Sequence, residues 1–182
     1  VAKAKAAREQ GADVVAMAMH SVQEYLDYAD SWQQEEAHEL ADTGAFDVIY
    51  GAGCHCAQPI ENYNGTWIIY GLGNAVTESA NTADTIVNNQ GVTARIQFAG
   101  KKGVAGSWRV NRIDWVPSAN VTQGKYQWCS LASDHPDGPC WDETQDANVR
   151  QRIWDVLYSM GADQNVVKEW NITAEQTSSS GQ

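Results

Sequence analysis

Two short apolar runs, at residues 14–19 and 46–50, stand out from the polar positions around them. Each run leads into a polar loop that contains a histidine, His20 after the first and His55 after the second. The pattern of residues 31–42, between the two runs, favours a helix. The chain therefore predicts a strand–helix–strand unit with an imidazole near the carboxyl end of each strand. Ligands and metal ions collect at that edge of open α/β sheets, so the pattern indicates a metal site.

Turn-forming and capping residues set the boundaries of the expected helices. Residues 1–10 are typical of a helix that Gly11 ends, because glycine readily adopts the left-handed conformation found at helix ends. Ser31 is the expected N-cap of the second helix. Trp32 contributes to the apolar side that we expect of that helix.

The middle of the chain is expected to be mainly β-structure. Asn64-Gly65 separates alternating runs at residues 59–63 and 66–70. This pair is a strong hairpin signal, because both central residues of a type I′ turn need a positive φ. Alternation predicts two more strands, at residues 92–99 and 107–116.

The remaining segments predict a loop, a helix and a tail. Residues 77–90 are polar and low in aromatic side chains, which is typical of an exposed loop. Apolar residues with helical spacing predict a helix that ends at Gly161. They are Val149, Ile153, Val156, Leu157 and Met160. We expect residues 177–182 to be disordered.

Composition narrows the class of molecule. The chain has 182 residues, of which 43% are hydrophobic, enough for one core in a single domain or in part of a larger one. A net charge of −11 argues against nucleic-acid binding, which needs a stripe of Lys and Arg. No apolar run approaches the roughly 18 residues of a membrane-spanning helix. Because the sequence opens within a helix and without an initiator Met, we expect it to be cut from a longer protein.

The four cysteines fall into two pairs. Cys129 and Cys140 flank a loop without secondary structure of its own, and a disulfide there would contribute roughly 2–3 kcal/mol. Such a bond would place the protein outside the cytoplasm, whereas two unlinked thiols are the alternative. Cys54 and Cys56 bracket His55, and cysteines two positions apart rarely bridge each other.

His20, Glu24 and His55 are the first candidates for metal-binding or catalytic residues. The carboxylate of Glu24 lies four residues after His20 and could orient an imidazole or contact a substrate. The alternatives are a surface histidine and a solvated loop acid. Cys54-His55-Cys56 offers three donors that can bind metal, but its spacing is unlike that of structural zinc sites, which repeat pairs two to four residues apart. The alternative is two small buried thiols beside one histidine.

The other histidines and the tryptophans carry weaker signals. His38 falls within the second predicted helix, beside acidic residues, and is expected to face solvent. His135, next to a proline in the Cys129–Cys140 loop, is interpreted in the same way. Most tryptophans are expected in the core, and a sugar-stacking face has no support in the sequence.

An ordered set of short motifs resembles the CapA family of bacterial capsule and poly-γ-glutamate synthesis proteins. The resemblance covers roughly residues 1–76. It is carried by residues 11–15, His20 with Glu24-Tyr25, Gln34 with residues 37–40, residues 46–51, His55, residues 58–61 and residues 69–74. It implies an α/β fold, namely the carboxyl-terminal portion of a two-sheet α/β/β/α sandwich like that of calcineurin-type metallophosphoesterases.

The resemblance also implies a site. His20 and His55 correspond to metal ligands, and the implied cofactor is a divalent metal of the Zn, Mn or Fe class. Asn74 sits in the family's Leu-Gly-Asn turn, which lines the same cleft, and Glu24 joins it as a candidate catalytic residue. The chain differs from the family at position 53, where it has Gly53 and the family has a further histidine.

The missing imidazole leaves alternatives open. Cys54 or Cys56 could replace it as a metal ligand, since thiolates bind zinc well. Without a replacement one metal position is weak or empty, and two-metal hydrolysis needs both ions. The alternatives are therefore a metal-dependent hydrolase of capsule or poly-γ-glutamate biosynthesis, a non-catalytic surface scaffold for polymer export or assembly, and a structural Cys/His zinc module.

The expected organisation follows from these motifs. Residues 1–120 are assigned to the carboxyl-terminal part of the CapA-like domain, residues 121–176 to an extension with the cysteine loop and the last helix, and residues 177–182 to the tail. The expected partners are the missing amino-terminal part of the same protein, an anionic surface polymer or its synthesis machinery, and a second copy, but no nucleic acid. We expect a location at the cell surface, and no activity from these 182 residues alone.

Overall fold

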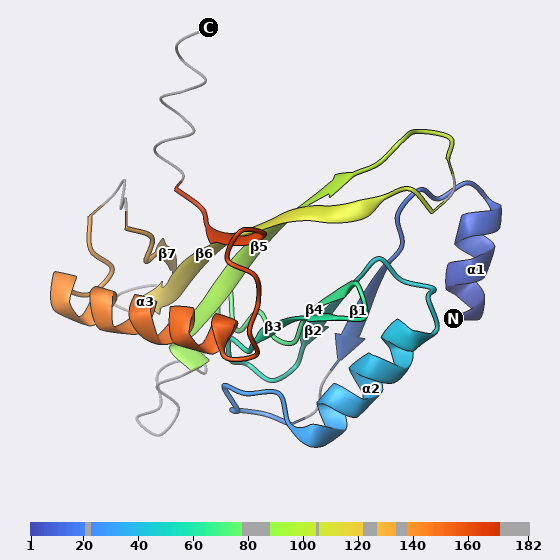
Figure 1. Ribbon diagram of the computed structural model, residues 1–182. Helices are drawn as coiled ribbons and strands as arrows, with labels where there is room; N and C mark the ends of the chain where they lie inside the picture. The colour runs from blue at the N-terminus through green and yellow to red at the C-terminus, as the bar shows by residue number, and fades with distance from the viewer. Residues whose placement is uncertain (21–22, 78–87, 105, 122–126, 134–137, 172–182) are drawn as a thin grey trace, which may run out of the picture.

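The computed structural model describes residues 1–20, 23–77, 88–104, 106–121, 127–133 and 138–171. Two β-sheets and three helices make up this part of the chain (Figure 1). The fold is α/β with two sheets, as predicted, and is consistent with part of a metallophosphoesterase-like sandwich. None of the described helices is long and apolar enough to cross a membrane.

The first sheet has the strand order β1-β2-β4-β3. The parallel neighbours β1 and β2, and β2 and β4, are completed by the antiparallel hairpin of β3 and β4. The bounds are β1 Ala16–His20, β2 Val48–Ala52, β3 Ile60–Tyr63 and β4 Thr66–Ile69. The predicted Asn64-Gly65 hairpin is confirmed, and both residues have a positive φ.

The second sheet follows in sequence. Strands β5, β6 and β7 are antiparallel neighbours, and β8 adds to β6 in parallel. The bounds are β5 Gln90–Ala99, β6 Arg109–Val121, β7 Gln127–Ser130 and β8 Val167–Glu169. The two strands predicted from alternation are confirmed, although β5 begins two residues earlier and β6 ends five residues later than predicted. Strands β7 and β8 were not predicted.

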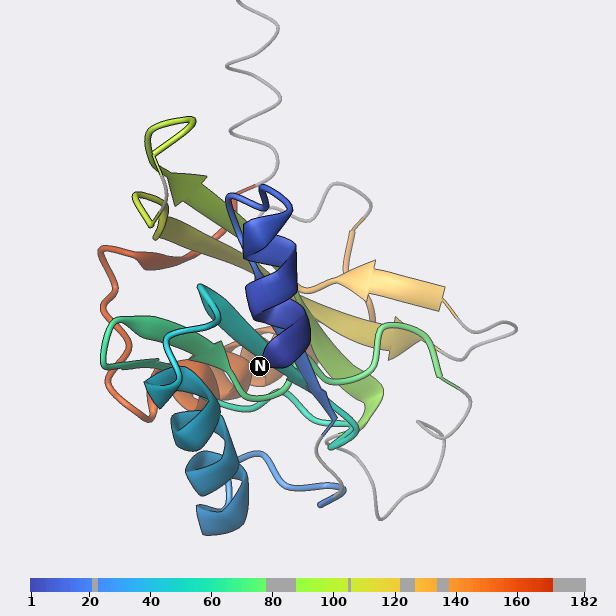
Figure 2. The same ribbon diagram turned by 90° about the vertical axis from the view of Figure 1, so that its right-hand side faces the viewer.

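In the first sheet β4 is buried on both faces and β2 is buried except at Tyr50 and Ala52, whereas β1 is mainly exposed. On one face α1 (Ala2–Glu9) and α2 (Ser31–Asp42) pack against Ile49 and Ile68, and Figure 2 shows α1 in front with α2 to its lower left. On the other face Val48 and Ile69 meet the second sheet. Alternate residues of a strand point to opposite faces, so the central strands β2 and β4, which are covered on both, are mainly apolar, as buried parallel strands usually are.

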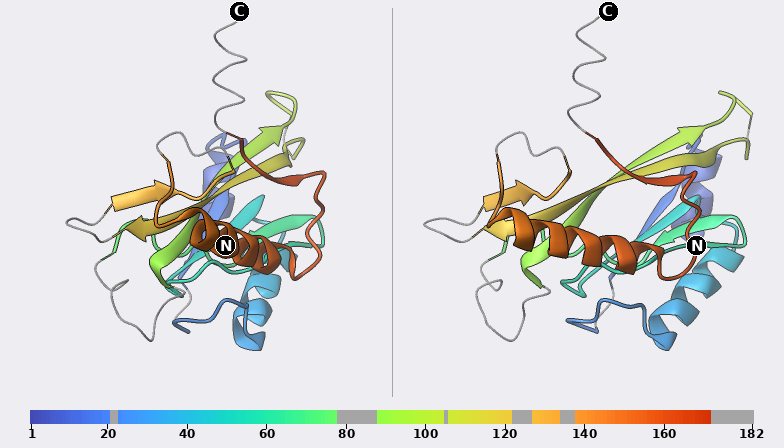
Figure 3. Two further views of the ribbon diagram at one scale, coloured as in Figure 1. Left: turned by 90° about the vertical axis from the view of Figure 1, so that its left-hand side faces the viewer. Right: turned by 60° about the vertical axis from the view of Figure 1, so that its left-hand side comes forward.

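The last helix, α3 (Glu143–Tyr158), closes the core between the sheets. Both views in Figure 3 show it alongside β5 and β6. Its buried residues Ile153 and Leu157 belong to the predicted apolar stripe, and Gly161 follows with a positive φ. The division of the chain at residue 120 stays a prediction.

The beginning of α2 corrects two expectations. The N-cap is Asp30 rather than Ser31, and its carboxylate accepts a hydrogen bond from the backbone N–H of Gln33 at 2.8 Å. Asp and Ser are equally good caps, so the sequence alone did not distinguish them. Trp32 is 52% exposed, because the buried side of the helix is formed by Gln33 and small residues.

Two further expectations were wrong in part. His38 does not simply face solvent. Its ring stacks on Tyr63 with centroids 3.7 Å apart, and its Nε2 lies 2.9 Å from Glu61 Oε2. The predicted loop 77–90 is not exposed at its end, since Asn88 and Gln90 are buried. Residues 78–87, His135 and the predicted tail lie outside the described residues.

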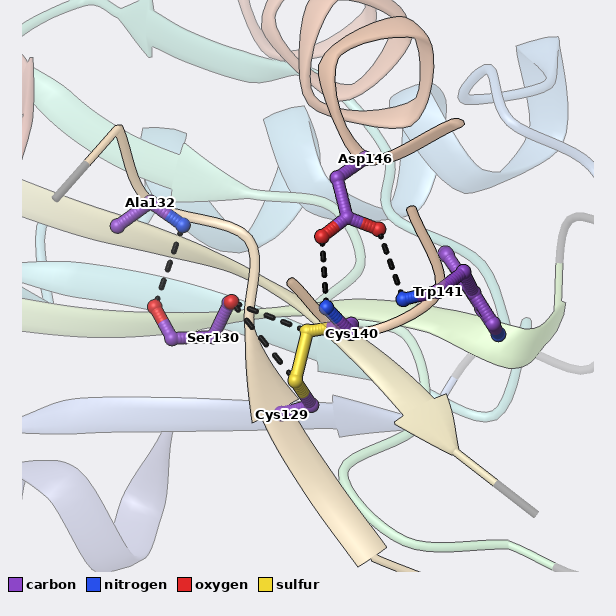
Figure 4. Close-up of a disulfide and its surroundings, with 6 residues drawn as sticks. All are labelled: Cys129, Ser130, Ala132, Cys140, Trp141 and Asp146. Carbon is purple, nitrogen blue, oxygen red and sulfur yellow. Dashed lines mark hydrogen bonds between the residues drawn. A yellow bond between two sulfur atoms is a disulfide. The ribbon is translucent and has the colours of Figure 1, made fainter. Parts of the chain in front are cut away.

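Cys129 and Cys140 form the predicted disulfide, with Cα atoms 5.8 Å apart. Figure 4 shows the carboxylate of Asp146 above this bond, where it accepts hydrogen bonds from the backbone N–H groups of Cys140 (2.7 Å) and Trp141 (3.1 Å). Asp146 is 2% exposed, and two backbone donors compensate its buried charge. The disulfide and Asp146 together anchor the segment that leads into α3.

Candidate functional site

The candidate site lies at the carboxyl ends of β1 and β2. In the register of this parallel pair His20 is opposite Ala52, so both strands end at the same edge. The loop after β2 carries His55, and the loop after β1 carries Glu24 and Tyr25. The candidate residues predicted to follow β1 and β2 therefore all lie at the same end of the sheet, where these two strands terminate.

The two loops are joined through unusual backbone conformations. Tyr25 and His55 have φ angles of 63° and 61°, and Gly53 has 98°. The backbone N–H of Tyr25 donates to the carbonyl oxygen of Cys54 at 2.8 Å, and the Tyr25 ring stacks on His55 with centroids 5.7 Å apart. A left-handed conformation costs a non-glycine residue on the order of 1–3 kcal/mol, and such residues cluster at functional sites. The fold therefore holds these two residues against a local conformational cost.

The His55 ring is oriented by Asn74. The Asn74 Nδ2 group donates to the carbonyl oxygen of Asn88 at 2.9 Å, which leaves its Oδ1 as an acceptor. His55 Nδ1 lies 2.9 Å from that oxygen and is therefore the protonated nitrogen of the neutral ring. The lone pair is then on Nε2, which lies 3.8 Å from Glu24 Oε1. An imidazole held in this way presents Nε2 to a metal ion or a proton.

Asn74 is itself fixed between the two sheets. Its backbone carbonyl accepts from Asn120 Nδ2 at 3.1 Å, and its N–H donates to Gln90 at 3.3 Å. Gly73 and Gly91 permit this close approach: a Cβ on Gly73 would lie 2.6 Å from the Gln90 oxygen, and one on Gly91 2.5 Å from the Asn74 oxygen. The second sheet thus holds the residue that orients His55.

Hydrogen bonds of buried side-chain amides connect the His55 loop to α2 and to the loop after β1. Gln33 Nε2 donates to Gln58 Oε1 at 2.8 Å, and Gln58 Nε2 donates to the Tyr28 carbonyl at 2.8 Å. Gly71 faces the same network, and a Cβ there would lie 2.5 Å from Cys54 Sγ. Gln58 belongs to a motif that carries the family resemblance, but its role in fixing both loops was not predicted.

The thiols of Cys54 and Cys56 are not linked and are each 1% exposed. Cys54 Sγ donates to the Cys56 carbonyl at 3.0 Å. Burial raises the pKa of Cys54, and burial, followed by the charges of Cys54 and Asp27, raises the pKa of Cys56 to about 12. Both thiols are therefore protonated in the metal-free protein at neutral pH, and binding a metal ion would require each to lose its proton.

The structure thus brings three of the candidate residues, Glu24, His55 and Asn74, into one cluster. His20 lies exposed at the same sheet edge. Among the described residues no three His, Cys, Asp or Glu side chains are grouped so that they could hold a metal ion. Two imidazoles and one carboxylate are ligands suited to zinc, manganese or iron, but a complete centre needs further donors.

The two-sheet α/β fold, with histidines near the carboxyl ends of two parallel strands, is consistent with part of a metallophosphoesterase-like sandwich. Residues 1–79 match the family model described as bacterial capsule synthesis protein PGA_cap. The chain is also 37% identical, over 105 residues, to the PGA biosynthesis protein CapA of Bacillus subtilis (strain 168). These two matches confirm the predicted resemblance of residues 1–79 to this capsule synthesis family.

The match to the Bacillus subtilis relative covers only part of each protein. It covers 57% of this chain and 25% of the relative, so the chain corresponds to about a quarter of the relative's length. The family model ends at residue 79 and includes all the candidate site residues, but neither the second sheet nor α3.

Proposed function

We propose that this chain supplies the carboxyl-terminal part of a metal-dependent, phosphoesterase-like site in a capsule or poly-γ-glutamate biosynthesis protein. The observation that carries the proposal is the orientation of His55, whose Nδ1 is held by Asn74 Oδ1 at 2.9 Å while Nε2 lies toward Glu24. A surface histidine without a function needs neither this support nor a left-handed backbone.

The proposed ligands are His20 and His55, with Glu24 beside His55. The metal would be of the Zn, Mn or Fe class, and when bound it would polarise a phosphoryl or carbonyl oxygen and activate water. Asn74 fixes the tautomer of His55, and Glu24 can hold a proton or a second ligand near Nε2. The ring of Tyr25 covers one face of the imidazole and limits its rotation. We leave Cys54 and Cys56 out of the ligand set because both are 1% exposed and the Cys54 thiol already donates to the Cys56 carbonyl.

The remaining donors would come from the rest of a longer protein. Strand β1 is at the edge of the first sheet, and an open parallel edge is normally covered. A cavity of about 500 Å³ beside it is lined mainly by apolar groups, among them Val15, Met17 and Phe46. We propose that another segment of the same protein covers this edge, and that a second copy occupies it when that segment is absent.

A non-catalytic role is the second candidate. Gly53 stands where the family has a histidine, and fewer than three suitable donors are grouped among the described residues. In that case the protein is a surface scaffold for export or assembly of an anionic polymer. Its acidic character, with a net charge of −11, is unfavourable for a polyanion unless metal ions bridge the charges.

Metal content and turnover of the full-length protein test these alternatives. We expect His20→Ala and His55→Ala to lower bound metal and phosphodiesterase turnover together. His38→Gln is the matched control, because His38 lies on α2 and contacts Glu61 and Tyr63 rather than the site. Metal-free, folded full-length protein without turnover would refute the enzyme and favour the scaffold. The 182 residues alone are expected to show no turnover.

A further inference from the structure

A cavity of about 340 Å³ lies where the first sheet meets the start of β6. Its walls come from the end of α1, the segment before β2, the β3–β4 turn and the first residues of β6. Figure 1 shows the end of α1 close to the start of β6. The cavity is at the amino ends of β2 and β4, whereas the His55 cluster is at the carboxyl ends of β1 and β2. It is therefore separate from the candidate metal site.

One cation and one acid of the cavity neutralise each other. Arg8 pairs with the carboxylate of Asp47, and the same Asp47 oxygen accepts a hydrogen bond from the backbone N–H of Val15 at 2.6 Å. Arg8 also donates to the carbonyl oxygen of Asp13 at 2.7 Å. This pair adds no net charge to the cavity, and its bonds hold the end of α1 against the segment before β2.

Arg109 is the second cation of the cavity, and no carboxylate of the described residues pairs with it. Its Nη1 donates to the carbonyl oxygens of Gly106 at 2.7 Å and of Trp108 at 2.6 Å. By contrast, Arg112 of the same strand pairs with Asp114. The two backbone contacts fix the guanidinium, and its Nε and Nη2 remain as parallel donors that match the two oxygens of a carboxylate. Arg109 is therefore suited to bind an oxyanion in the cavity.

The charge around the cavity favours a ligand with a single negative charge. Residues 88–113 contain five of the twelve Lys and Arg residues and none of the 23 Asp and Glu residues. Because Asp47 is paired with Arg8, the cavity has one excess positive charge, that of Arg109. A second negative charge on a ligand would meet the Asp47 carboxylate without a further cation to balance it. A monoanion also avoids the repulsion that the net charge of −11 imposes on a polyanion.

The uncharged part of the lining favours a ligand with an apolar ring. Phe46, Trp108 and Val110 contribute aromatic and aliphatic surface, against which a ring can pack. The indole of Trp108 lies against Gly100, where an added Cβ would be 2.5 Å from the ring. The Nε1–H of Trp108 is buried and has no acceptor among the described residues. A ligand oxygen that accepts from it would remove the cost of this unpaired donor.

We propose that the cavity between α1 and β6 binds a small monocarboxylate that carries an apolar ring. Arg109 binds the carboxylate, and Trp108 contacts the ring and donates its indole N–H to a ligand oxygen. The volume is at the lower end of the range for small-molecule sites. The inference goes beyond the proposed function and does not depend on a metal ion. Because the walls come from both the matched region 1–79 and β6, a bound ligand would join these two parts of the chain.

Binding of phenylacetate to the 182-residue chain tests the proposal. Phenylacetamide has the same ring without the charge, and phenyl phosphate has a larger negative charge, so we expect phenylacetate to bind more tightly than either. The indole N–H resonance of Trp108, identified by its absence in Trp108→Phe, should shift during an NMR titration. Arg109→Gln should weaken binding about tenfold to a hundredfold, the range for loss of a charge-assisted contact. Lys102→Gln is the matched control, because it removes the same charge from an exposed turn outside the cavity lining.

Two further variants separate the contacts. Arg109→Lys keeps the charge without the paired donors and should bind more weakly than the wild type but more tightly than Arg109→Gln. Trp108→Phe keeps an aromatic ring and removes the N–H, and it should weaken binding about twofold to tenfold.

Three results would overturn the site: no saturable binding by the folded wild type, equal affinities for phenylacetate and phenylacetamide, or equal losses in Arg109→Gln and Lys102→Gln. Tighter binding of phenyl phosphate than of phenylacetate would overturn the assignment to a monocarboxylate. His55→Ala should leave binding of phenylacetate unchanged, because His55 is at the other end of the first sheet. A failure of the metal site is therefore distinguishable from a failure of this site.

Discussion

The orientation of His55 by Asn74 can be tested by replacing Asn74 with alanine. The substitution removes two side-chain hydrogen bonds, the contact with His55 Nδ1 at 2.9 Å and the donation to the Asn88 carbonyl at 2.9 Å. Each is worth about 1 kcal/mol net, so we expect the free energy of unfolding to fall by about 2 kcal/mol. For a chain of this size the loss corresponds to a decrease of about 4–8 °C in Tm.

The tautomer of His55 provides the more specific assay. In the wild type, long-range ¹⁵N–¹H NMR spectra at a pH where the ring is neutral should show the proton on Nδ1. In Asn74→Ala the ring loses its acceptor, and we expect the proton to move largely to Nε2. Asn111→Ala is the control, because its side chain makes one exposed contact, with Gln97, and its loss should change stability by less than about 0.5 kcal/mol. An unchanged tautomer in Asn74→Ala would refute the proposed role of Asn74.

Three further predictions concern the support of the site. Gly71→Ala would place a Cβ 2.5 Å from Cys54 Sγ, and we expect a loss of about 1–3 kcal/mol by urea unfolding; equal stability of Gly71→Ala and wild type would contradict the packing described above. The Cys129→Ser/Cys140→Ser double variant should lose about 3 kcal/mol in unfolding free energy, and a wild type that is equally stable with and without reductant would argue against the disulfide. Burial raises the pKa of Cys56 from the 9.0 of an unperturbed thiol to about 12 in the folded chain, so above pH 9 the folded state binds more protons than the unfolded state. Stability from this group is complete below about pH 9 and is lost as the pH rises toward 12; Cys56→Ala should show a smaller loss between pH 8 and 10 than the wild type, and an identical pH dependence would count against the shift.

The sequence predicted the elements whose signals are local. The strands carrying residues 14–19 and 46–50, the Asn64-Gly65 hairpin and the apolar stripe of α3 follow from periodicity and turn chemistry. Short edge strands such as β7 and β8 lack such a signal, because four or three residues are too few for alternation to be distinctive. The N-cap of α2 was displaced by one residue because Asp30 and Ser31 are both good caps.

The candidate site was predictable only in part. The motifs indicated Glu24, His55 and Asn74, and the structure brings these three side chains together. The tautomer of His55 was not predictable, because it depends on the carbonyl of Asn88, which lies 33 residues later in the chain. His38 was misjudged for a similar reason: its partners Glu61 and Tyr63 lie on a different element, and helix periodicity does not report them.

The contact of Gly73 with Gly91 has a consequence for where this protein can be divided. A shortened chain that stops at residue 79 would retain every histidine, carboxylate and amide of the candidate centre. It would lose Asn88, Gln90 and Asn120, to which Asn74 is bonded. The imidazole of His55 would then be free to turn, so the smallest unit that preserves the centre must extend at least through β6.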